Sequence, residues 1–194
     1  LREGAAVGTS SMRRGAQLRR VRPDLQILSL RGNLQTRLAK LDRGDFDAIV
    51  LAEAGLERMG LEMDYARLDA ERFVPSANQG TIIVVARKGT AAEQHSRALD
   101  HAPTRTETMI ERRILETVGG GCVVPMAVHA SASGRSARVL AEVLSLDGRR
   151  FVRLDEEISL NDRPLDRAED MGQRLMNMGG RELVDEAVKK FGAR

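Results

Sequence analysis

Short apolar segments alternate with segments of helical periodicity over the first 60 residues of this 194-residue chain. The apolar segments cover residues 5–8, 25–30 and 46–52, and the helical segments cover residues 12–21, 34–42 and about 53–60. Pro23 and Gly44 follow the first two helical segments, and both residue types end helices. This alternation predicts βαβ units, so we expect a largely parallel sheet in the N-terminal half.

A different pattern follows in the second half of the chain. Residues 81–86 (TIIVVA) are expected to form a strand, followed by helices over residues 91–100 and 103–118. Three strand-like stretches come next, near residues 123–130, 137–146 and 150–158, with hairpin signals at residues 133–134 and 147–148. Helices over residues 164–178 and 181–191 complete the pattern. The chain is therefore predicted to be α/β at its start, with an α+β part built on a three-stranded antiparallel sheet.

Basic residues are concentrated at the start of the chain. Residues 1–40 hold nine Lys or Arg against two acids, whereas the remainder holds 22 bases against 26 acids. Arg outnumbers Lys 27 to 4, and the planar guanidinium pairs bidentately with carboxylate or phosphate. This bias suits a small anionic partner, although on charge alone a solvated basic face is the favoured interpretation. With four Phe, one Tyr and no Trp, a base-stacking surface for nucleic acid is not expected.

Several other classes of protein are disfavoured by the composition. No apolar run reaches the roughly 20 residues that span a bilayer, so no membrane partner is expected. One cysteine cannot form an internal disulfide, and three scattered histidines have no metal-ligand spacing, so no metal is expected. No targeting segment is visible, and we expect a cytoplasmic protein. Because the chain opens on Leu1 and runs at once into a strand, it is expected to be a piece of a longer protein.

The first candidate site is the turn between the first strand and the first helix. It contains Thr9, Ser10, Ser11, Arg13 and Arg14. A helix N-terminus offers free N–H groups and a partial positive charge, which suit a carboxylate or phosphate. Two arginines there oppose the dipole unless an anion is present, although Ser and Thr are also routine helix caps.

The second candidate site follows the second strand. It contains Arg31, Gly32, Asn33 and Arg37. Because ligands bind at the carboxyl ends of parallel strands, we expect both sites to lie on one edge of the sheet, with four arginines over one cleft.

Cys122 is the third candidate, directly after three glycines. A lone cysteine is usually a small buried hydrophobe. Glycines, however, leave a neighbouring side chain exposed. The loop follows the C-terminus of a predicted helix, where the dipole does not activate a thiol. Permanent covalent attachment therefore fits this cysteine better than nucleophilic catalysis.

Together these motifs resemble the porphobilinogen deaminase (hydroxymethylbilane synthase) family. The resemblance rests on residues 7–14 (VGTSSMRR), 22–25 (RPDL), 30–33 (LRGN), 36–38 (TRL), 40–42 (KLD), 47–52 (DAIVLA), 54–56 (AGL) and 120–125 (GGCVVP). It implies a transferase that joins four porphobilinogen molecules head to tail and releases ammonia at each step. It also implies a dipyrromethane cofactor that anchors the growing polypyrrole through a thioether to Cys122.

The resemblance assigns roles to the arginines and their neighbours. Each pyrrole carries an acetate and a propionate, which guanidinium groups can bind bidentately. The implied cofactor-binding residues are Cys122, Ser11, Arg13, Arg14, Arg31, Gly32 and Gln79. The implied substrate-binding residues are Thr9, Ser10, Asn33 and Arg37.

The resemblance also implies a division into domains. A periplasmic-binding-protein-like α/β domain two would cover residues 1–74, and residues 75–102 would return to domain one. Residues 103–194 would form the α+β domain three, which bears the cysteine loop. Asn78 replaces the glycine that usually opens the Gly-Gln-Gly linker.

The first half of domain one has no counterpart in this sequence. It carries the family's catalytic aspartate, so no catalytic residue is assigned here and the chain alone is expected to be inactive. The missing half is an expected partner, and the complete protein is expected to be a monomer. The alternative function, from a different class, is a non-catalytic carboxylate-binding α/β module.

Overall fold

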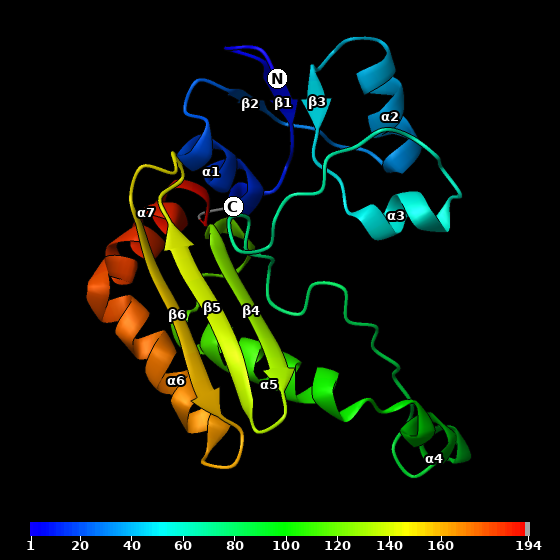
Figure 1. Ribbon diagram of the computed structural model, residues 1–194, viewed down its shortest axis with the longest axis vertical. Helices are drawn as coiled ribbons and strands as arrows, with labels where there is room; N and C mark the ends of the chain where they lie inside the picture. The colour runs from blue at the N-terminus through cyan, green and yellow to red at the C-terminus, as the bar shows by residue number, and fades with distance from the viewer. Residues whose placement is uncertain (193–194) are drawn as a thin grey trace.

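The computed structural model describes residues 1–192 and contains two three-stranded sheets (Figure 1). In the first, β1 (Ala6–Gly8), β2 (Gln26–Leu28) and β3 (Ala48–Ile49) are parallel, in the order β2-β1-β3. The helices that alternate with them are α1 (Met12–Val21), α2 (Leu34–Asp42) and α3 (Glu53–Arg58). The predicted parallel sheet is confirmed.

Local signals explain where α1 and α2 begin. The Ser11 hydroxyl accepts a hydrogen bond from the N–H of Arg14, and the Asn33 side chain accepts one from the N–H of Thr36. Each cap satisfies a backbone donor that the helix itself leaves free. The bounds of both helices are confirmed, because capping depends only on residues close in sequence.

The second sheet is antiparallel, in the order β4 (Met126–Ser133), β5 (Ser136–Leu144) and β6 (Phe151–Ser159). The helices of this part are α5 (Ala102–Val118), α6 (Pro164–Leu175) and α7 (Arg181–Phe191), and a kinked segment (Met176–Gly180), in which Gly179 has φ of +110°, joins the last two. The predicted α+β organisation is confirmed. Within residues 1–192, no helix has the length and apolar character that a bilayer crossing requires.

The two faces of β5 have different partners. Val139, Ala141 and Val143 belong to the main apolar core, which also contains buried side chains of α5, α6 and α7. On the opposite face, Leu140 packs with Val74 in a small separate cluster. That face also carries Glu142, which contacts α1. Helix α1 therefore lies between the two sheets, against the end of the antiparallel one (Figure 1).

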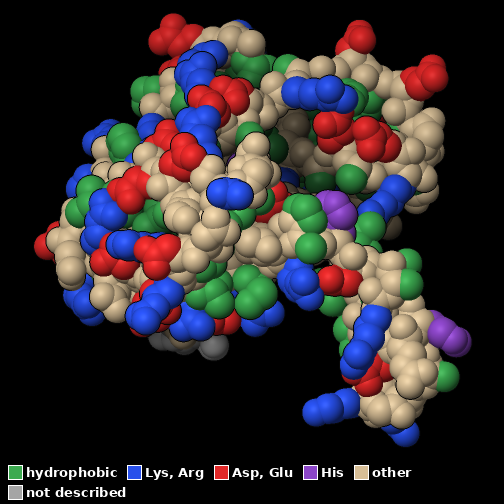
Figure 2. Space-filling model, turned by 60° about the horizontal axis from the view of Figure 1, so that its bottom comes forward, with side chains coloured by type: hydrophobic (Ala, Val, Ile, Leu, Met, Phe, Trp, Pro, Cys, Tyr) green, Lys and Arg blue, Asp and Glu red, His purple; other side chains and the backbone are tan. Residues whose placement is uncertain are grey.

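The strand predicted for residues 81–86 is absent, so this prediction is wrong. The segment has no regular secondary structure and pairs with no strand in the part of the chain that the structure describes. Ile82 and Val85 are 79% and 89% exposed. A strand exists only where a neighbouring strand accepts its backbone hydrogen bonds. Together with α4 (Ala91–Ser96) and the 3-10 turn Arg97–Leu99, the segment forms an arm that projects from the body (Figure 2).

Two other predicted strands are shorter than expected. The segment 46–52 pairs only over Ala48–Ile49, and the segment 25–30 only over Gln26–Leu28. In the second segment, Gln26 and Leu28 are also exposed, although the segment is apolar. The reason is its place in the sheet, because β2 is an edge strand and has a neighbour on one side only.

Candidate functional site

The loops after β1 and β2 meet at the carboxyl edge of the parallel sheet. The N–H of Thr9 donates to the carbonyl oxygen of Leu28 over 2.9 Å. The hydroxyl of Ser10 donates to the carbonyl oxygen of Leu30, whose side chain is fully buried. The two candidate turns therefore lie on the same edge, as the sequence predicts.

The hydroxyl groups of the first turn are largely used to shape it. Oγ1 of the buried Thr9 accepts from the N–H of Ser11 over 3.2 Å, and Oγ of Ser11 accepts from the N–H of Arg14 over 3.3 Å. Both bonds satisfy backbone donors at the start of α1. The turn therefore has a defined shape before any ligand binds.

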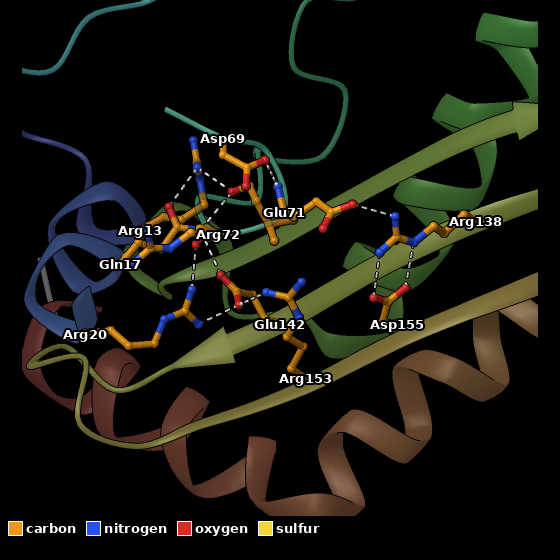
Figure 3. A network of polar contacts seen from close by, with 11 residues as sticks. Arg13, Gln17, Arg20, Asp69, Glu71, Arg72, Arg138, Glu142, Arg153 and Asp155 are labelled. Atoms are coloured by element: carbon orange, nitrogen blue, oxygen red, sulfur yellow. Dashed lines mark hydrogen bonds and ion pairs between the residues drawn. The ribbon is translucent and has the colours of Figure 1, made fainter. Parts of the chain in front are cut away.

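Arg13 points back toward the body of the protein (Figure 3). Its Nη1 donates to the carbonyl oxygen of Val74 over 2.7 Å and to Oε1 of Gln17 over 3.2 Å. Burial, and then the neighbouring Arg14 cation, lower the pKa of Arg13 to about 10, while Glu142 opposes part of this shift. Its Nε and Nη2 donate to none of residues 1–192, so one edge of the guanidinium is free.

Arg14 has no partner for its guanidinium among the described residues, although the side chain is half-buried. Burial, followed by the charge of Arg37, lowers its pKa from the ordinary value. The two cations therefore lie close enough to disfavour one another. An anion between them would remove this penalty, so the pair is suited to a carboxylate.

The loop that carries Arg31 and Gly32 is held by local contacts. Gly32 has φ of +121°, and a Cβ there would lie 2.8 Å from the Cβ of Thr36. Oδ1 of Asn33 accepts from both N and Oγ1 of Thr36, so it caps α2. Arg37 donates from Nε to the carbonyl oxygen of Gly32 over 2.8 Å. Arg31 is exposed, and its side chain makes no hydrogen bond within the described chain.

The four arginines do not all line the same depression. A groove of about 610 Å³ lies between the start of α1, the edge strand β2, the β5–β6 turn and α7. Ser10, Ser11 and Arg31 line it, but Arg13, Arg14 and Arg37 do not. The structure therefore brings Arg14 near Arg13 and Arg37, while Arg31 faces the groove on the side of β2.

Cys122 is exposed, on a short 3-10 turn (Gly121–Val123) before β4. Gly120 in this loop has φ of +82°, and a Cβ there would lie 2.3 Å from Cγ2 of Val124. A glycine is therefore required where the loop turns back onto the core. Strand β4 starts at the end of the sheet that α1 covers (Figure 1). The sulfur is thus accessible for covalent attachment, in the loop that leads into β4.

Gln79 lies in the linker that crosses from the first part to the second. Its Oε1 accepts from the hydroxyl of Ser76 over 3.1 Å, and its side chain is exposed. The preceding Asn78 has φ of +60°, and its N–H donates to Oε2 of the buried Glu111 over 2.6 Å. The linker is therefore anchored to α5 by Glu111, with Gln79 beside this anchor.

Two polar residues next to the site were missed by sequence reasoning. Glu142 is fully buried, and its carboxylate accepts from Nε2 of Gln17 over 2.8 Å and from Nη1 of Arg20 over 2.7 Å (Figure 3). Gln17 is also fully buried. In the sequence, the one indication of a buried carboxylate is the acidic residue inside the apolar run of residues 139–144 (VLAEVL). Within residues 1–192, no group of three or more His, Cys, Asp or Glu side chains is placed to hold a metal ion.

Two family models match the chain, and both describe one family. Residues 1–95 match the model described as porphobilinogen deaminase, dipyromethane cofactor binding domain. Residues 105–178 match the model described as porphobilinogen deaminase, C-terminal domain.

Curated relatives carry the same name. The probable porphobilinogen deaminase of Methanococcoides burtonii is 50% identical over 190 residues, which are 97% of this chain and 61% of the relative. That of Methanosarcina mazei is 48% identical over 190 residues, which are 97% of this chain and 60% of the relative. The porphobilinogen deaminase of Pelobacter propionicus is 39% identical over 193 residues, which are 96% of this chain and 61% of the relative. The chain thus spans about three fifths of the length of these relatives, and it belongs to the porphobilinogen deaminase family.

Proposed function

We propose that this chain binds the dipyrromethane cofactor and the growing polypyrrole of a porphobilinogen deaminase. In that reaction four porphobilinogen molecules are joined head to tail to give hydroxymethylbilane, with release of ammonia at each step. The observation that carries the proposal is the arrangement of Arg13, Arg14 and Arg37. These half-buried cations have no carboxylate partner within residues 1–192, and they lie at the sheet edge where ligands bind.

The residues present fit a cofactor that carries carboxylate side chains. The free edge of Arg13 and the unpartnered guanidinium of Arg14 can each take a carboxylate through two hydrogen bonds. Arg31 offers a further cation beside Ser10 and Ser11. The exposed sulfur of Cys122 is available for a thioether. When bound, the cofactor supplies the anchor on which the pyrrole chain grows.

We further propose the roles of individual residues. Cys122 holds the cofactor covalently, and Ser11, Arg13, Arg14, Arg31, Gly32 and Gln79 surround it. Thr9, Ser10, Asn33 and Arg37 face the substrate side. Asn33 and Gly32 contribute through the loop backbone, because the Asn33 side chain caps α2 and Gly32 permits the turn.

The proposed domain organisation follows the same division. Residues 1–74 form one domain, residues 103–194 form another, and residues 75–102 belong to a third. The exposed apolar segment around Ile82 and Val85 supports this division, since its side chains and backbone lack partners within residues 1–192. The relatives are longer than this chain, and additional polypeptide of that kind would pair with the segment around Ile82 and Val85. The complete protein is proposed to act as a monomer in the cytoplasm.

Calorimetric titration with porphobilinogen tests the binding site. Replacing Arg13 or Arg14 by Leu should weaken binding by about 1.5–3 kcal/mol, because each removes a charge-assisted hydrogen-bonding group. Arg181→Leu is the matched control, since Arg181 is exposed and makes no side-chain hydrogen bond within residues 1–192. Equal affinities for the wild type, both site variants and the control would contradict the proposed site.

Intact-mass measurement tests the covalent anchor. When the chain is produced together with the polypeptide that completes its relatives, a mass addition is expected on the wild type. Cys122→Ala should carry none and should lose activity while remaining folded. An active complete protein with an unmodified Cys122 would overturn the assignment.

A further inference from the structure

The buried Gln17 amide connects two parts of the molecule that are distant in sequence. Its Nε2 donates to the carbonyl oxygen of Val74 over 2.8 Å and to Oε1 of Glu142 over 2.8 Å. Its Oε1 accepts from Nη1 of Arg13 over 3.2 Å. All polar atoms of this amide are therefore used, and they link α1 to β5 (Figure 3).

Only one orientation of this amide is compatible with its neighbours. A backbone carbonyl and a carboxylate are both acceptors, so the NH2 group of Gln17 must face Val74 and Glu142. The oxygen of the amide is then left facing Arg13. The carboxylate of Glu142 is itself held by Arg20 over 2.7 Å and Arg153 over 3.4 Å. Glu142 thus ensures that Arg13 faces the oxygen of the Gln17 amide and not its NH2 group.

The contact also determines which edge of Arg13 is free. Val74 and Gln17 occupy the two donor directions of Nη1. Nε and Nη2, which together form the side-on fork of a guanidinium, donate to none of the described residues. A fork held in this way loses little further freedom when it binds a carboxylate.

We propose that Gln17, oriented by the buried carboxylate of Glu142, is a positioning residue that holds Arg13 ready for a pyrrole carboxylate. The inference rests on the proposed function, in which Arg13 binds an acidic arm of the cofactor or substrate. Because Glu142 lies on β5, the same contact fixes the arginine turn relative to the sheet that follows the Cys122 loop.

The first test needs no ligand. In 15N spectra of the wild-type protein, the Nε–Hε signal of Arg13, assigned by its loss in Arg13→Lys, should report a rigid guanidinium. Gln17→Met keeps the volume of the side chain but removes the amide, and it should make this group markedly more mobile. Gln173→Met is the matched control, because Gln173 is exposed on α6 and makes no side-chain hydrogen bond in the described chain. An unchanged Arg13 signal in Gln17→Met would overturn the inference.

The second test measures coupling in porphobilinogen binding. Gln17→Met should weaken binding about fivefold, as is typical for neighbours in one hydrogen-bond network. In an Arg13→Met background the same change should have no further effect. An equal loss in both backgrounds would show that Gln17 acts only through general stability, and it would overturn the positioning role.

A third variant covers the case in which Gln17→Met does not fold. Glu142→Gln keeps the shape of the side chain but can donate as well as accept, so only the Val74 carbonyl oxygen still requires the NH2 group of Gln17. It should also increase the mobility of Arg13, and an unchanged signal would overturn the inference. If the wild type binds no porphobilinogen, the proposed function fails, while the Arg13 signal still decides whether Gln17 holds Arg13.

Discussion

At the scale of single residues, the polar groups around the site divide into those that shape it and those left free to bind. Thr9, Ser11 and Asn33 cap helices or turns, so their side chains already have partners. Arg14 and Arg31 make no side-chain hydrogen bond within residues 1–192, and Arg13 keeps one edge free. Cations near a helix N-terminus oppose its dipole, so they lower stability slightly in the absence of an anion. This cost is consistent with a binding role for the arginines.

One prediction at this scale concerns His129, which lies beside the linker anchor. Its Nδ1 is 3.6 Å from Oε1 of Glu111, and contact with Glu111 raises the pKa of His129 above its ordinary value of 6.5. Glu107 adds to the shift, while burial opposes it. Because the pKa of His129 is higher in the folded state, the stability that its contact with Glu111 adds is complete below pH 6.5. This stability is lost as the pH rises through the pKa of His129 in the folded protein.

Urea unfolding between pH 6 and pH 8.5 tests this expectation. The wild type should lose about 0.5 kcal/mol of stability over this interval through His129, a size typical of a partly exposed pair. His129→Gln keeps a hydrogen-bonding group that does not titrate, so the loss of stability with rising pH that comes from His129 should disappear. The same pH slope in both proteins would contradict the assignment.

At the scale of secondary-structure elements, the packing of α1 on the β5–β6 turn is especially close. Gly148 in this turn has φ of +74°, and a Cβ there would lie 2.3 Å from the carbonyl oxygen of Ala16. Arg19 of the same helix donates to the carbonyl oxygen of Leu146 over 3.1 Å. The turn therefore accepts α1 only because residue 148 has no side chain.

Gly148→Ala is expected to lower stability by about 2–4 kcal/mol, because backbone strain and a clash with α1 act together. The β4–β5 turn offers a matched control. Gly134 has φ of +60°, but no heavy atom of the described residues lies within 4 Å of its Cβ position, so Gly134→Ala should cost only about 1 kcal/mol. Thermal or urea unfolding measures both, and equal losses would show that the close approach of α1 is unimportant.

The exposed segment 81–86 allows another prediction at the scale of elements. A β-branched apolar segment without paired backbone groups favours association between chains. Because Val85 is 89% exposed, Val85→Lys should leave the unfolding free energy of this chain within about 0.5 kcal/mol of the wild type. Light scattering should show less aggregation of the variant. A large loss of stability would mean that the segment packs within the chain.

At the scale of the whole molecule, Glu142 links helix α1 of the N-terminal part to the antiparallel sheet. It accepts hydrogen bonds from Gln17 and Arg20 of α1 and from Arg153 of β6. The buried core of the parallel sheet is small, consisting of Ala5, Val7, Leu18 and Leu25. The N-terminal part therefore depends on its contact with the antiparallel sheet more than on its own core.

Removing this link should separate the unfolding of the two parts. Glu142→Ala leaves Arg20 and Gln17 without their buried partner, so we expect a loss of about 3–5 kcal/mol. Calorimetry should show the N-terminal part unfolding first and the transition broadening or splitting. A single sharp transition at the wild-type temperature would contradict the proposed dependence.

The sequence alone was sufficient for features that depend on neighbours in the chain. Helices α1 and α2 were predicted to the residue, because caps and helix breakers act within a few positions. The glycine turns of the antiparallel sheet follow in the same way. Whether Cys122 is buried or exposed was left open by the sequence, and the structure shows it exposed. The family was also recognisable from motifs of this kind.

Tertiary structure decided what depends on contacts between distant residues. The strand predicted for residues 81–86 does not form, since a strand requires a partner and none lies beside it within residues 1–192. Gln17 and Glu142 are 125 positions apart, and only the packing of α1 on β5 brings them together. No local pattern can reveal such a contact, because a hydrogen bond across the fold depends on the relative placement of two elements.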